Sequence, residues 1–149
     1  MFVMLLVTLV AVGAAVAAWL RPIPHNTYAT PPAPTYSEQQ VADAKSKACA
    51  AFAKVKKAST MNSTRNGGDD PNGQLLIAVN GRQVYIASSQ YVLTTLADEP
   101  ATPPELATAG RKLASLYQVI AMDGLASDSS PQAREAADAT GQTIDGLCK

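Results

Sequence analysis

Histidine and cysteine are scarce in this chain of 149 residues, which has one histidine and two cysteines. A catalytic triad needs a base beside its nucleophile, and a zinc site needs about four ligands, so a single histidine supports neither. His25 also has no second metal-type ligand nearby in the sequence. Neither a G-x-S-x-G elbow nor a phosphate-binding glycine loop is present. We therefore expect a protein that is not an enzyme, without catalytic residues, cofactor or metal site.

Net charge and aromatic content are also low. Twelve basic residues balance twelve acidic ones, and only 5% of the residues are aromatic. A chain without net charge has no overall field to attract nucleic acid or an acidic substrate, so we expect no nucleic-acid partner. Abundant alanine with few aromatic side chains favours closely packed helices over an aromatic-rich β-sandwich.

The first twenty residues contain no charged side chain. About 20 apolar residues form about 30 Å of helix, the thickness of a bilayer's hydrocarbon core. Trp19 and Arg21 lie where residues of the membrane interface belong. We therefore predict a transmembrane anchor over residues 1–20. A cleaved signal peptide is the alternative, because residues 15–17 (AVA) fit a cleavage site, but the apolar run is long for one and no basic residue precedes it.

Residues 21–36 form a proline-rich linker with five of the ten prolines and no periodic apolar face. In an extended polyproline conformation of about 3.1 Å per residue, this stalk spans on the order of 40 Å. It holds the following domain, residues 37–149, away from the membrane. His25 lies within this linker, where we expect it to be solvated.

A first helix is expected from Ser37 to about Thr64. Ser37 and Gln40 have the spacing of a capping box, in which each side chain satisfies a free backbone N–H of the other residue. Basic residues border both sides of the predicted buried stripe, where their stems can cover apolar surface, although such borders also occur on helices that lie in a membrane interface. The stripe recurs at helical spacing and comprises Val41, Ala44, Ala48, Ala51, Phe52, Val55 and Ser59.

The loop that follows contains Asp69, Asp70 and Asn72, but a calcium loop is not expected because the twelfth position from Asp70 is Gly81 and not a glutamate. Asp70 and Pro71 instead fit a helix N-cap followed by proline.

Residues 74–97 are the most apolar stretch after the predicted anchor. Asn80-Gly81 between two apolar runs is a strong hairpin signal, but no further strand candidate exists to extend a hairpin into a sheet. We therefore prefer a long helix with Gly81 as a weak point, and a hairpin stays the alternative. This helix is predicted to bury Leu76, Val79, Ile86, Leu93 and Leu96.

Two more helices complete an all-α fold. Thr102 and Glu105 are predicted to form a second capping box for a helix that ends near Leu125. Ser130 and Pro131 then begin a last helix. The predicted buried positions of these two helices are Leu106, Ala109, Leu113, Leu116, Tyr117 and Ile120, followed by Ala133, Ala137, Gly141, Ile144 and Cys148.

Cys49 lies on the first predicted helix and Cys148 at the end of the last one. A disulfide that closes a loop of about 100 residues stabilises the folded domain by about 4–5 kcal/mol in the chain-entropy model. An even number of cysteines after a membrane segment favours an oxidising compartment. We therefore predict a disulfide that closes a small four-helix bundle outside the cytoplasm. Two buried free thiols or a redox pair are the alternatives, the latter disfavoured by the absence of a C-x-x-C motif.

The chain resembles the uncharacterised, alanine-rich, single-pass membrane proteins of actinobacteria in YSEQQVADAKSKACAAFAKVKKA (36–58), in NGRQVYIASSQYVLTTLADEPATPPELA (80–107) and in the terminal Cys148-Lys149. In that family a short tail, one membrane helix and a stalk precede a helical domain with two cysteines. The resemblance covers about residues 36–149. It implies a helix through Asn80-Gly81 but no activity and no binding residues. This chain differs in lacking a charged tail before its apolar segment.

These patterns predict a single-pass protein of the cell membrane that contacts lipid through residues 1–20. Its domain outside the cytoplasm would act as a non-catalytic interaction or accessory module of the cell envelope, with an envelope protein as partner. The alternative is a carrier or sensor of a lipid or apolar small molecule, which needs a pocket of a few hundred Å³. A packed core with an exposed apolar groove would favour the interaction module.

Overall fold

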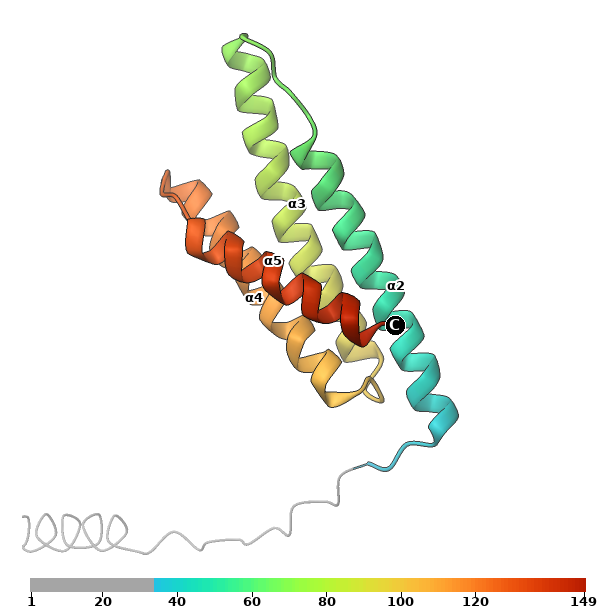
Figure 1. The fold of residues 1–149 in the computed structure, drawn as a ribbon. Helices are drawn as coiled ribbons and strands as arrows, with labels where there is room; N and C mark the ends of the chain where they lie inside the picture. Colours follow the sequence, from blue (N-terminus) through green and yellow to red (C-terminus); the bar gives the residue numbers. More distant parts are fainter. Residues whose placement is uncertain (1–33) are drawn as a thin grey trace, which may run out of the picture. The chain divides into compact units, whose positions relative to one another are not determined.

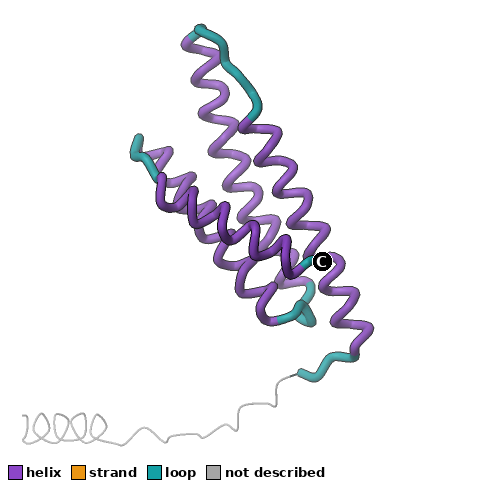
Figure 2. The backbone as a smooth tube through the Cα atoms, in the orientation of Figure 1, coloured by secondary structure: helices purple, strands orange, loops and turns teal. Residues whose placement is uncertain are grey.

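The computed structural model describes residues 34–149, which contain four helices and no strand (Figure 1, Figure 2). The predicted anchor with Trp19 and Arg21, the alternative cleavage site and His25 lie outside the described residues. The helices are α2 (Glu38–Ser63), α3 (Pro71–Asp98), α4 (Pro104–Ala126) and α5 (Pro131–Leu147). None of these four is both long and apolar enough to span a bilayer. The all-α fold predicted for the domain is confirmed.

Three of the predicted helix starts are confirmed, including that of α5, where Ser130 is the N-cap before Pro131 but makes no side-chain capping bond. The other two have side-chain caps. Ser37 caps α2, since the Gln40 backbone N–H donates to Ser37 Oγ at 3.2 Å and the Ser37 backbone N–H donates to Gln40 Oε1 at 2.8 Å. Asp70 caps α3 by accepting from the backbone N–H of Gly73 at 3.1 Å, with Pro71 at the first helical position. Both caps satisfy backbone donors that a helix N-terminus leaves free.

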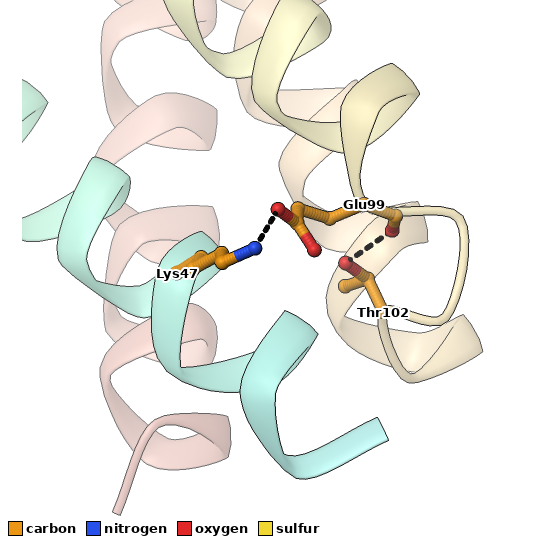
Figure 3. Close-up of polar contacts among 3 residues, drawn as sticks. All are labelled: Lys47, Glu99 and Thr102. Carbon is orange, nitrogen blue, oxygen red and sulfur yellow. Dashed lines mark hydrogen bonds and ion pairs between the residues drawn. The ribbon is translucent and has the colours of Figure 1, made fainter. Parts of the chain in front are cut away.

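The predicted capping box of Thr102 and Glu105 is wrong. Pro103 is the N-cap of α4 and makes no side-chain capping bond. Thr102 is buried and its hydroxyl donates to the Glu99 carbonyl oxygen at 2.8 Å, which closes the preceding turn (Figure 3). Because Pro103 and Pro104 have no backbone N–H, this helix start has fewer free donors for a cap to satisfy.

The helix through Asn80-Gly81 is confirmed, because α3 runs without interruption from Pro71 to Asp98. Its predicted buried face is largely wrong. Leu96 is buried and Leu93 partly buried, but the other three predicted core residues are exposed, and Ser88, Ser89 and Val92 are buried in their place. The exposed ones are Leu76, Val79 and Ile86.

The position of α4 and α5 explains this difference. In Figure 1 the α2–α3 hairpin extends past α4 and α5 at the end that carries the loop between Ser63 and Pro71. The first half of α3 therefore has few neighbours to cover it. Farther along, where several helices meet, small side chains such as Ser88 and Ser89 face inward and allow close approach.

The core lies where α4 packs against the hairpin of α2 and α3, and α5 packs against α4 and adds Ala137 and Ile144 to the same core. At this crossing a Cβ on Gly110 would lie 2.5 Å from Phe52 Cζ, so any larger residue would displace the Phe52 ring. The core also contains Val92, Leu106 and Ile120, each almost fully buried. Residues Thr35–Lys149 form one compact unit with this core and both cysteines, so it can be studied without the preceding residues.

Candidate binding surfaces

The two cysteines lie together, as the sequence predicts. Cys49 in α2 and Cys148 at the C-cap of α5 form a disulfide-bonded pair with Cα atoms 5.7 Å apart, although 99 positions separate them in the sequence. Cys49 lies in the middle of α2, so the bond ties the last turn of α5 to the side of α2. The disulfide therefore joins the first and last helices of the domain.

The basic residues that border α2 contact neighbouring helices. Lys47 pairs with Glu99 at 2.6 Å (Figure 3), and this hydrogen bond raises the pKa of the Lys47 ammonium. Lys54 lies over the Tyr91 ring, 5.2 Å from its centroid. Lys56, on the other border, pairs with Asp145 of α5. The lysines of one border therefore contact α3 and its C-cap, and Lys56 of the other border contacts α5.

A groove lies between α2 and α5, which contact each other much less closely than α4 and α5 do. One part of about 480 Å³ runs beside the disulfide, and an adjoining part of about 400 Å³ reaches inward to α4. We call these two parts together the α2–α5 groove. Both parts share a set of lining residues: Phe52, Lys56, Thr60, Ile144 and Asp145.

Two hydroxyl groups line the inner part of the α2–α5 groove. Tyr117 of α4 is buried, and burial raises the pKa of its phenol, while the adjacent Ser59 hydroxyl offsets part of that rise. Ser59 Oγ has no solvent contact and makes no hydrogen bond of ordinary geometry among the described residues, but the Tyr117 hydroxyl lies near enough to share one with it. A hydroxyl has one donor and two acceptor sites, so this position still has unused hydrogen-bonding capacity.

Gly141 leaves part of the α2–α5 groove unfilled. It lies on α5 and lines the inner part of the groove, and a Cβ added there would meet no atom within 4 Å. Ala137, one turn earlier, also lines this part. The small residues at these two positions therefore leave an opening toward α2.

A second candidate surface lies on the outer side of α3 and α4. Arg82 contacts α4 at Gly124, where an added Cβ would lie 3.3 Å from Arg82 Nε. Large apolar side chains are also exposed on both helices, and several of them are more than half exposed, including Met122 at 62%. On α3 they follow the spacing of one helical face. We call these residues the α3–α4 patch, which comprises Leu75, Val79 and Ile86 of α3 with Met122 and Leu125 of α4.

Sequence reasoning missed both surfaces. The signal for the α3–α4 patch was the apolar run LLIAV at residues 75–79, which is apolar on every side and so exceeds what one buried face requires. The signal for the α2–α5 groove was the small-residue face of the last helix. Within residues 34–149, no group of three or more His, Cys, Asp or Glu side chains is placed to hold a metal ion.

No protein-family model matches the chain, and no curated protein or solved structure matches it either. The resemblance to alanine-rich actinobacterial membrane proteins stays a prediction from the stretches quoted above.

Proposed function

We propose that this protein is a membrane-anchored, non-catalytic module of the cell envelope that binds a protein partner through the α3–α4 patch. The apolar residues 1–20 with Trp19 and Arg21 support the anchor. The pairing of Cys49 with Cys148 supports a location outside the cytoplasm, because disulfides persist in oxidising compartments.

The observation that carries the proposed partner binding is the exposure of the α3–α4 patch. The core cluster forms without these five side chains, and large apolar side chains that stay exposed on the folded domain suit an interaction site. Arg82 lies among them, and methionine and arginine are both enriched in protein interfaces. The composition of the patch therefore suits a protein partner.

The place of the patch within the domain suits the same role. The linker joins the domain at the start of α2, and the 26 residues of α2 span about 39 Å. The first half of α3 lies beside the second half of α2, at the end of the domain away from the linker (Figure 1).

Photo-crosslinking in native membranes tests the proposed function. With a photoreactive amino acid in place of Met122 in the full chain, we expect an adduct of one defined mass. Thr108, exposed on the same helix but outside the patch, provides the matched control position and should give none. The Met122 adduct should disappear when Leu75→Asp and Leu125→Asp are introduced together. Equal adducts at both positions, or none at Met122, would contradict the proposal.

A carrier or sensor of an apolar small molecule is the second candidate function. The α2–α5 groove favours it, because its two parts of about 480 and 400 Å³ fall within the range of small-molecule sites.

A further inference from the structure

The walls of the α2–α5 groove are mostly apolar. Phe52 of α2, Ile144 of α5 and the disulfide line the outer part, and Val55 and Leu113 continue the apolar surface inward. An extended hydrocarbon chain placed along this surface would be removed from water on the side that faces the protein, which is favourable in proportion to the area covered.

The inner end of the groove offers hydrogen bonding to one small polar group. Ser59 Oγ is buried beside the hydroxyl of Tyr117, and a contact between these two groups uses only part of the hydrogen-bonding capacity of each, since a hydroxyl has one donor and two acceptor sites. A ligand hydroxyl can both donate and accept a hydrogen bond, so it could satisfy Ser59. A quaternary ammonium group has no hydrogen to donate and no lone pair to accept with.

The charges around the groove cancel. Lys56 and Lys57 lie along α2, and Asp138 and Asp145 lie along α5, with Lys56 and Asp145 already paired across the opening. A charged head group of either sign would meet one like charge for each opposite one, so these residues give it no net attraction to offset the hydration it loses at the buried inner end. An uncharged head group loses less hydration and leaves the Lys56–Asp145 pair intact.

We propose that the α2–α5 groove is a binding site for an uncharged amphiphile, a molecule with a hydrocarbon chain and a hydroxyl head group. The chain lies along Phe52, Ile144 and the disulfide, and the head group binds Ser59 and Tyr117. This site is separate from the α3–α4 patch and does not depend on the proposed protein partner.

Three probes with the same ten-carbon chain test the head-group preference: decanol, undecanoate and decyltrimethylammonium. Each is titrated below its solubility limit or critical micelle concentration into the isotopically labelled Thr35–Lys149 unit, and backbone amide shifts are followed by NMR. We expect decanol to saturate shifts at residues of the groove and to bind about tenfold more tightly than either charged probe. Equal affinity for the three probes would overturn the proposal, as would shifts confined to the α3–α4 patch.

Two glycines of α5 provide a matched pair of variants. A Cβ at either Gly141 or Gly146 meets no atom within 4 Å, but only Gly141 lines the groove. Gly141→Leu should fill the groove and weaken decanol binding by about tenfold, whereas Gly146→Leu should leave the affinity within about twofold. Both variants improve helix propensity, so both should fold, and their melting curves check this. Equal effects of the two variants would contradict binding in the groove.

Ser59→Ala separates the head group from the chain. It should weaken decanol binding while leaving binding of decane, which has no hydroxyl, unchanged. Loss of both affinities to the same degree would show that Ser59 does not contact the head group and would overturn its assignment.

Discussion

Gly81 shows how one residue can be read in two ways from sequence and in one way from structure. After asparagine it suggests a hairpin turn, yet it lies in the interior of α3. The hairpin reading failed because a turn signal is local, whereas no other strand was present to stabilise a sheet. Ser37 and Asp70 were predicted correctly because a helix cap depends only on residues two or three positions away.

Gly81→Ala should stabilise the domain by up to about 1 kcal/mol, because alanine has the higher helix propensity. The added Cβ would lie 3.2 Å from Asn62 Nδ2, at the flexible end of a side chain that can shift by a few tenths of an ångström. Urea denaturation of the Thr35–Lys149 unit measures the change. A lower midpoint would show that Asn62 is held in place and that the contact outweighs propensity.

Gly110→Ala is the control for that measurement. It makes the same chemical change inside a helix, but the new Cβ would lie 2.5 Å from Phe52 Cζ in the core. Overpacking of this kind costs about 1–3 kcal/mol, so this variant should be less stable than the wild type. Opposite signs for the two substitutions are the expected result.

At the scale of the helices, the sequence predicted that each helix exists, but it did not always predict which face of the helix is buried. The buried residues of α4 were predicted well, since one of its faces is clearly apolar and the opposite face carries Arg111 and Lys112. On α3 apolar residues occur all round the helix, so periodicity could not choose a face, and the choice depends on where α4 and α5 lie. The same dependence kept the α3–α4 patch and the α2–α5 groove out of reach of sequence reasoning.

The attachment of α5 to α2 leads to a prediction about that helix. Apart from the Lys56–Asp145 pair, α5 makes few contacts with α2, so the Cys49–Cys148 bond is its main tie there. Cys148→Ser should lower the free energy of unfolding by up to about 4–5 kcal/mol in the chain-entropy model, and α5 should loosen first. Hydrogen exchange should therefore accelerate at the amides of α5 before those of α4.

Two controls accompany this variant. Cys49→Ser breaks the same bond from the other side and should give the same exchange pattern. Intact-mass measurement of the exported wild-type protein after alkylation should show no free thiol until a reductant is added. Two freely alkylated cysteines in the native protein would remove both the bond and the argument for an oxidising compartment.

For the molecule as a whole, the contacts of the lysines on α2 indicate whether the folded domain binds a membrane surface. Basic residues on both borders of an apolar helix face also describe a helix that lies on anionic lipid. Here Lys47 binds Glu99, Lys56 binds Asp145 and Lys54 lies over Tyr91, while the apolar face between them is buried in the core. These three lysines therefore contact other residues of the domain. The chain also carries no net charge that would attract it to a membrane surface.

We therefore expect that the Thr35–Lys149 unit will not sediment with anionic liposomes at physiological salt. Sedimentation that disappears at high salt and after Lys47→Glu with Lys54→Glu would show that α2 binds lipid through its basic border. Sedimentation that persists at high salt but is lost after Leu75→Asp with Leu125→Asp would instead place the α3–α4 patch in the bilayer. Either result would make lipid, and not a protein, the binding partner of the domain. The salt dependence distinguishes the two surfaces, because salt screens binding by lysines but not the burial of apolar side chains.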